Sequence, residues 1–175
     1  MRLETKRLII RSLLPEDETA YIKMASDGSL HEIFGDCSDC QEWMGSWLKE
    51  AIQLDKENNP RQEYLAYAIA EKESGRVIGS VGCSYYEDLD KTGITYFIGS
   101  NYRRKGYAAE ATRAYADYFL QNYPYPEIIA TVQTKNIPSC KVVERAGFSL
   151  TETKNYKDIN DEKDEIYNFY KQTVW

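Results

Sequence analysis

Three positive charges stand directly before a glycine and an alanine-rich run in the segment Ser100–Phe119. They are Arg103, Arg104 and Lys105, and the glycine is Gly106. The start of a helix exposes unpaired backbone N–H groups and carries a partial positive charge. A glycine there lets an anion approach the backbone closely, and basic side chains can reach phosphate oxygens. The segment therefore predicts a pyrophosphate site, with a solvated charge cluster before an amphipathic helix as the alternative.

Two other phosphate-binding motifs do not fit this segment. The dinucleotide-binding fingerprint needs G-x-G-x-x-G and a later acidic residue, whereas this segment has one glycine. The Walker motif G-x-x-x-x-G-K-[ST] does not occur in the sequence.

A second segment, 136–147, carries three helix signals. Asn136 is a good N-cap, Pro138 suits the first turn, and Gly147 suits the C-terminal cap. Ser139 lies in the first turn of this predicted helix, where a serine commonly satisfies backbone N–H groups.

The elements that must position these segments follow a mixed order. Hydrophobic periodicity and turn residues predict a strand, two helices, three strands, a helix, a strand, a helix and two strands. The predicted strands lie at 6–13, twice within 63–87 around a turn at 72–75, and at 91–100, 127–133, 148–158 and 165–175. The predicted helices lie at 15–26, at 41–58, after residue 106 as far as Pro124, and at 136–147. This order is α+β, and the middle three strands form an antiparallel meander.

Tryptophans fall in the predicted helix 41–58. Trp43 and Trp47 lie at helical spacing with Ile52 and Leu54, which predicts a core face. The alternative for the two tryptophans is the wall of a substrate groove.

Composition limits the class of protein. With 175 residues and 42% hydrophobic content, we expect a single folded domain over residues 1–175. The net charge of −6 argues against nucleic acid as the main partner and fits a positively charged substrate slightly better. There is no apolar run of membrane-helix length, and charges interrupt the apolar N-terminus, so we expect a cytoplasmic protein with no membrane partner.

Four cysteines raise the question of a metal or redox site. Cys37 and Cys40 form C-x-x-C, which can be half a zinc site or a redox pair, but His31 is the sole histidine. Cys83 and Cys140 are isolated in predicted buried elements. We expect four reduced cysteines and no metal.

Taken together, three motifs resemble the GNAT superfamily of acetyl-CoA-dependent N-acetyltransferases. "RRKGYA" at 103–108 is similar to Q/R-x-x-G-x-G/A, and "NIPSCKVVERAGF" at 136–148 is similar to N-x-x-S…GF. The opening "LETKRLIIRSLLPEDE" and "GYAAEA" look like the branch that acetylates the N-termini of ribosomal proteins. The resemblance covers nearly the whole chain.

The resemblance implies a mostly antiparallel central sheet that is splayed in the middle and flanked by about four helices. Strand 93–99 would part from 127–133, and the pantetheine arm of CoA would bond to backbone groups near Phe97 and Ile98. Asn136 would touch the pantetheine side, and Ser139 would lie near the sulfur. The pyrophosphate would sit on the amides of Arg104, Lys105, Gly106, Tyr107 and Ala108, with Arg103 contributing charge.

The implied reaction moves an acetyl group from the CoA sulfur to an amine. Many relatives use a tyrosine as general acid at the position of Val143, which cannot donate a proton, so Ser139 is the substitute. Relatives often carry an acid near the position of Gly93. Here the candidates for the base are Glu87, Asp88 or water held by Tyr85, Tyr86 or Tyr96. A free N–H near Phe97 could stabilise the oxyanion.

The leading hypothesis is therefore an N-acetyltransferase acting on a peptide N-terminus or a small amine, by direct attack in a ternary complex. The acceptors considered are polyamines, amino acids and aminoglycosides. A second hypothesis is a CoA-binding module that senses or regulates without turnover, and a third is an interaction protein with no cofactor. The resemblance also allows a homodimer.

Overall fold

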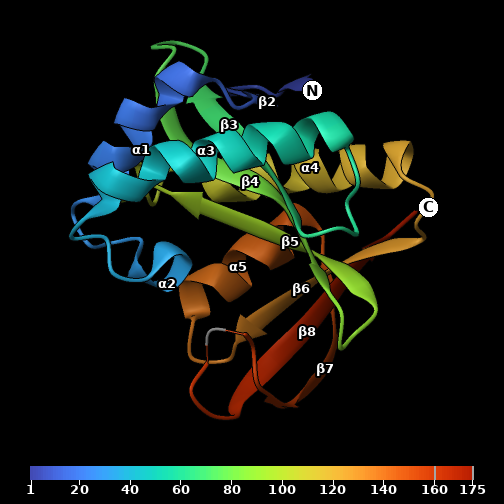
Figure 1. The fold of residues 1–175 in the computed structure, drawn as a ribbon. Helices are drawn as coiled ribbons and strands as arrows, with labels where there is room; N and C mark the ends of the chain where they lie inside the picture. The colour runs from blue at the N-terminus through green and yellow to red at the C-terminus, as the bar shows by residue number, and fades with distance from the viewer. Residues whose placement is uncertain (160, 175) are drawn as a thin grey trace.

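The chain folds around one eight-stranded sheet. The computed structural model describes residues 1–159 and 161–174, and the strand order is β1-β2-β3-β4-β5-β6-β8-β7 (Figure 1). The strands are β1 (Arg2–Glu4), β2 (Leu8–Ser12), β3 (Tyr64–Glu71), β4 (Val77–Tyr86), β5 (Lys91–Ile98), β6 (Glu127–Gln133), β7 (Ser149–Tyr156) and β8 (Glu165–Thr173). The α-helices are α1 (Glu18–Ala25), α2 (His31–Phe34), α3 (Cys40–Glu57), α4 (Tyr107–Asn122) and α5 (Ile137–Ala146).

The predicted α+β class and the order of the long elements are confirmed. The three middle strands form the expected antiparallel meander, and the turn between β3 and β4 closes where the Gly75 N–H donates to the Glu71 carbonyl at 2.8 Å. Among the strands and α-helices, two short elements were not predicted, the edge strand β1 and the one-turn helix α2. The predicted last strand extends to Trp175, which lies outside the described residues.

Helices cover both faces of the sheet. One buried cluster joins α4 and α5 to alternate strand residues such as Tyr67 and Val81, and a second joins α1 and α3 to the opposite face. In Figure 1, α3 crosses the near side of the sheet and α4 crosses the far side. Strand alternation therefore assigns each side chain of β3 to β6 to one of two helical layers.

The buried face of α3 differs in part from the predicted one, which shares Leu54 with it. Its buried residues are Cys40, Met44, Leu48, Ala51 and Leu54, while Trp43 and Trp47 are only partly buried. Both tryptophan rings pack on Phe34 of α2, with centroids 5.6 Å and 5.1 Å away. The tryptophans thus border the core and hold α2 in place.

All four cysteines are free and buried. In the described part of the chain, no three His, Cys, Asp or Glu side chains come together as metal ligands. Within the same residues, none of the helices is both long and apolar enough to cross a membrane.

The sheet parts between β5 and β6, as the resemblance implied. These parallel strands share one register pair in the described chain, Gly93 with Ile129, and Figure 1 shows the two arrows running apart with α5 between them. An ion pair between Lys91 and Glu127 joins the two strands at the closed end, and Lys171 of β8 lies 3.5 Å from the same carboxylate. The opening therefore widens toward the C-terminal ends of both strands.

Candidate active site

The turn before α4 has the backbone that an anion site requires. Arg104 and Gly106 have φ angles of 63° and 79°, and Gly106 is the N-cap residue of the helix. Among the described residues, no side chain caps the first N–H groups of α4. These amides are therefore available for a ligand at the positive end of a 16-residue helix.

A long-range contact from the N-terminal strands holds this turn. Arg7 donates from Nη1 to the Lys105 carbonyl at 2.7 Å and from Nε to Glu110 at 2.7 Å. Glu110 also accepts from the Arg7 N–H at 2.9 Å and from the Thr5 hydroxyl at 2.6 Å. Burial alone would raise the pKa of Glu110, but the hydrogen bonds from Thr5 and Arg7 outweigh it and lower the pKa. Arg7 and Glu110 were not among the predicted site residues.

The three basic residues of the motif have different environments. Arg103 is already engaged, since it donates to the carbonyls of Ile98 at 2.9 Å and Ser29 at 3.0 Å. Lys105 lies over the ring of Tyr102. The side chain of Arg104 is exposed and makes no hydrogen bond or ion pair within the described residues, which leaves it free to approach a phosphate.

The parted strand presents backbone groups to the opening. The Gly99 N–H donates to the Ile78 carbonyl of β4 at 2.9 Å. Two residues before Gly99, Phe97 of β5 pairs with Ser80 of β4. Since N–H groups alternate sides along a strand, the Phe97 N–H also points toward β4, whereas the N–H groups of Tyr96 and Ile98 point toward the opening. Within the described chain, the backbone donors nearest to Phe97 that point into the opening are therefore those of its two neighbours.

The first turn of α5 lies across the opening from β5. Asn136 caps the helix, because its Oδ1 accepts from the Ser139 N–H at 3.2 Å. The hydroxyl of Ser139 lies 2.6 Å from that of Tyr96, which reaches it from β5. Burial raises the pKa of Tyr96 to about 12, although the bond to Ser139 opposes the shift. Val143, one turn after Ser139, is fully buried in the core.

A tyrosine ring occupies the closed end of the opening. A Cβ on Gly93 would lie 2.5 Å from the ring of Tyr86, so the glycine makes room for that ring. The Tyr86 hydroxyl lies 3.5 Å from that of Thr131 on β6, and burial raises its pKa. Tyr86 thus spans both strands at the point where they separate.

The structure does not bring Glu87 next to Ser139. Glu87 is exposed in the turn before β5, and its carboxylate makes no hydrogen bond or ion pair in the described chain. Tyr96, the partner of Ser139, lies five residues beyond Lys91, about 17 Å along the strand at about 3.4 Å per residue.

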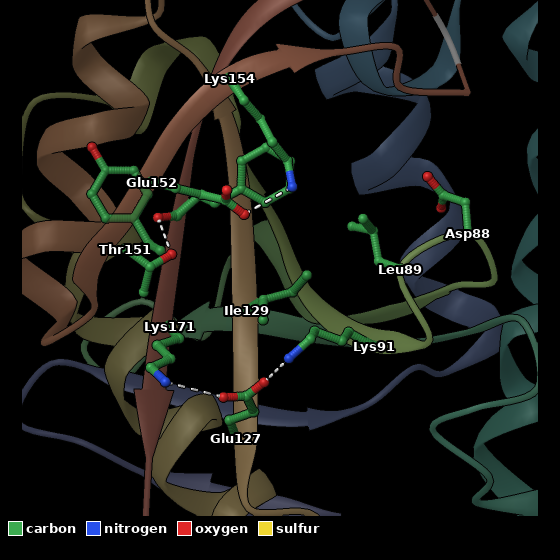
Figure 2. Close-up of a pocket in the computed structure, with 11 residues that line it drawn as sticks. Asp88, Leu89, Lys91, Glu127, Ile129, Thr151, Glu152, Lys154 and Lys171 are labelled. Carbon is green, nitrogen blue, oxygen red and sulfur yellow. Dashed lines mark hydrogen bonds and ion pairs between the residues drawn. The ribbon is translucent and has the colours of Figure 1, made fainter.

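Asp88 instead lines a groove of about 390 Å³ at the closed end, shown in Figure 2. The groove is lined by the β4–β5 turn and by residues of β5 to β8. It contains as many carboxylates as ammonium groups, namely Asp88, Glu127, Glu152, Lys91, Lys154 and Lys171. Glu127 pairs with two of the lysines and Glu152 with the third. This groove is therefore close to neutral.

Comparison with known proteins decides the family. The family described as "Acetyltransferase (GNAT) domain" matches residues 7–149. The chain belongs to the GNAT acetyltransferase family. As a GNAT acetyltransferase it is an acyltransferase with acetyl-CoA as co-substrate, which confirms the class of enzyme predicted from the sequence.

The relatives of this GNAT chain are similar over most of their length. YnaD of Bacillus subtilis, named an uncharacterized N-acetyltransferase, is 26% identical over 148 residues, or 85% of this chain and 82% of YnaD. A GNAT-family acetyltransferase from Bacillus anthracis has a TM-score of 0.78 at 19% identity, covering 99% of this chain and 98% of the other. RimL, a ribosomal L7/L12 α-N-protein acetyltransferase solved with CoA, has a TM-score of 0.81 at 13% identity, covering 99% and 98%. The last two establish a shared fold.

Proposed function

We propose that this GNAT protein transfers the acetyl group of acetyl-CoA to a primary amine, of a peptide N-terminus or a small molecule, by direct attack in a ternary complex. The observation that carries the proposal is the parting of β5 and β6 beside the uncapped start of α4. A parted sheet leaves backbone groups unpaired, and buried unpaired groups are costly unless a ligand satisfies them. The amides of a pantetheine arm suit that need.

The residues proposed to bind acetyl-CoA come from the motif at 103–108, from β5 and from the start of α5. The amides from Arg104 to Ala108 would hold the diphosphate, with Arg104 and Lys105 adding charge. The N–H groups of Tyr96 and Ile98 would pair with the arm, in a strand-like manner that gives the thioester a defined position. Asn136 would approach the same arm from α5.

Ser139 is the proposed general acid. Acetyl-CoA supplies an activated acyl group whose leaving group is a thiolate. The Ser139 hydroxyl, at the start of α5 and partly exposed, would donate a proton to that sulfur. One of the two N–H groups, that of Tyr96 or Ile98, is the donor we assign to the developing oxyanion, and the other then pairs with the arm.

The amine must lose a proton before it attacks. A lysine amine titrates near about 10.4 and an α-amine near about 7.7–8, so an α-amine needs less help at neutral pH. We propose that Glu87 receives this proton through water, because its carboxylate has no partner among the described residues but lies away from Ser139. Glu87→Gln should then lower kcat less than about 10-fold, well below the effect of removing a directly bonded base.

Release of CoA thiol from acetyl-CoA across a panel of peptides and small amines tests the proposal. We expect amine-dependent thiol release together with thermal stabilisation by CoA. Stabilisation without thiol release from any amine would instead support the non-catalytic CoA-binding sensor. Neither stabilisation nor release would contradict both.

A further inference from the structure

A tyrosine hydroxyl lies against the first turn of α5, and this tyrosine, Tyr96, belongs to β5. The Tyr96 hydroxyl lies 2.6 Å from Ser139 Oγ and 3.3 Å from the Ser139 carbonyl oxygen. Both side chains are partly buried at the opening between β5 and β6. A phenol hydroxyl is thus fixed against the first turn of α5, one turn before the buried Val143.

The usual task of a first-turn serine is already done by another residue. The N–H of Ser139 donates to Asn136 Oδ1 at 3.2 Å, so the helix start is capped without the serine hydroxyl. Within the described chain, the one hydrogen bond of Ser139 Oγ is the bond to Tyr96. The pair therefore calls for an explanation other than helix capping.

The direction of the bond follows from the acidity of the two groups. A phenol is a stronger hydrogen-bond donor than an aliphatic alcohol. The Tyr96 O–H has two acceptors in reach, Ser139 Oγ at 2.6 Å and the Ser139 carbonyl oxygen at 3.3 Å, and the shorter distance favours Oγ. Burial raises the pKa of Tyr96 to about 12, so Tyr96 keeps its proton near neutral pH and can donate it to the nearer acceptor, Ser139 Oγ. With Oγ accepting from Tyr96, the proton of Ser139 is left to point elsewhere.

We propose that Tyr96 is a positioning residue for the reaction: its hydroxyl donates to Ser139 Oγ and directs the Ser139 proton toward the thioester sulfur. This inference rests on the proposed function, in which Ser139 is the general acid. It assigns to a residue of β5 a part of the task that the family gives to a tyrosine of the helix.

The proton transfers of the proposed reaction explain why Tyr96 would affect kcat. As the amine nitrogen bonds to the acetyl carbon and the C–S bond breaks, Ser139 gives its proton to the sulfur and later regains one from water. The amine loses its proton through water to Glu87, which releases it to the solvent. Tyr96 keeps its own proton throughout, and its bond strengthens while Oγ carries developing negative charge. The gain is therefore made in the transition state, which raises kcat with little effect on KM for acetyl-CoA.

Kinetics of Tyr96→Phe, Ser139→Ala and the double variant test this inference. We expect Tyr96→Phe to lower kcat about 10-fold and to change KM for acetyl-CoA less than 2-fold. In the Ser139→Ala background, adding Tyr96→Phe should lower kcat no further, because Tyr96 acts through Ser139. Tyr64→Phe is the matched control, since it removes another partly buried phenol that bonds Glu50 at 2.7 Å, and its kcat should match the wild type.

Several results would overturn the inference. An unchanged kcat in Tyr96→Phe, or multiplying effects of the two substitutions, would show that Tyr96 does not work through Ser139. A fall in thermal stability with a matching loss of CoA affinity would assign Tyr96 a structural role. Failure of the wild-type protein to acetylate any amine would contradict the proposed function itself, and is thereby distinguished from failure of the inference.

Discussion

Ser139 lies in a first helical turn without the capping role common there, because Asn136 takes it. Its hydroxyl bonds a tyrosine hydroxyl of the facing strand instead. At this scale the site depends on single groups: one hydroxyl for the leaving thiolate and one glycine for the phosphate turn. Each can be tested by a single substitution that changes little elsewhere in the fold.

Replacing Ser139 with alanine should lower kcat about 10- to 100-fold and change KM for acetyl-CoA little. The expected loss lies at or below the low end of the range for a general acid, because a thiolate can also leave unprotonated. Steady-state kinetics with the best amine acceptor measures it. An unchanged kcat would remove the serine from the mechanism.

Replacing Gly106 with valine should weaken CoA binding at least 100-fold, about 2.7 kcal/mol, while the chain still folds. A β-branched residue is strained at a φ of 79° and would crowd the backbone that receives the diphosphate. Gly75→Val is the control, since Gly75 has a φ of 69° in a distant turn with open space around it. Equal CoA affinity in both variants would contradict the assignment of the turn.

At the scale of elements, the turn between β1 and β2 supports the start of α4 across 103 residues of sequence through Arg7 and Glu110. At its other end, the opening depends on the contact of Gly93 with Tyr86. These two contacts hold the two ends of the proposed cofactor site.

Glu110→Gln should destabilise the chain by about 1–2 kcal/mol at pH 7, because the carboxylate accepts from charged Arg7 and from Thr5. The folded-state pKa of Glu110 is lowered, so its contribution is present above the unfolded pKa near 4.5 and is lost as pH falls through the folded value. Urea unfolding from pH 7 to pH 3 measures this. The difference from wild type should shrink below pH 4.5, whereas Glu73→Gln, at an exposed glutamate, should show none. A difference that stays constant with pH would refute the role of the charge.

Gly93→Ala should lower the melting temperature by roughly 2–12 °C, from an overpacking cost of about 1–3 kcal/mol, because its Cβ meets the Tyr86 ring. Calorimetry measures the shift. Tyr86→Ala in the same chain frees that space, so Gly93→Ala should cost much less in that background. The same loss in both backgrounds would show that the ring is not what requires the glycine.

Sequence patterns predicted the long elements but not the contacts between them. The meander and α4 follow from periodicity and turn residues, whereas β1 and α2 have three and four residues, too few for a periodic signal. The core face of α3 was predicted only in part, because a tryptophan is equally apolar in the core and at its border, and here both tryptophans pack on the short helix α2.

Site residues that belong to a local motif were predicted, whereas partners that only the fold brings together were not. The glycine turn was visible as a local motif, and Ser139 as part of another. The sequence did not predict that Arg7 holds the glycine turn or that Tyr96 bonds Ser139. These pairings join residues 98 and 43 positions apart, and local spacing does not indicate such contacts. A carboxylate beside the reaction centre was expected at Glu87, and its remote, exposed position depends on where the β4–β5 turn falls in the fold.

At the scale of the whole molecule, the parted sheet links the phosphate turn of α4 to the first turn of α5. The alternation of β5 gives this arrangement a signature: Tyr96 and Ile98 have N–H groups toward the opening, and Phe97 does not. A cofactor arm lying in the opening would pair with the first two and leave the third as it is.

Amide hydrogen exchange, followed residue by residue by NMR with and without CoA, tests this claim most directly. The predicted result is new protection at Tyr96, Ile98, Tyr107 and Ala108, with little change at Phe97, whose N–H already faces β4. Protection elsewhere with none at these four amides would contradict the proposal that CoA lies between the parted strands.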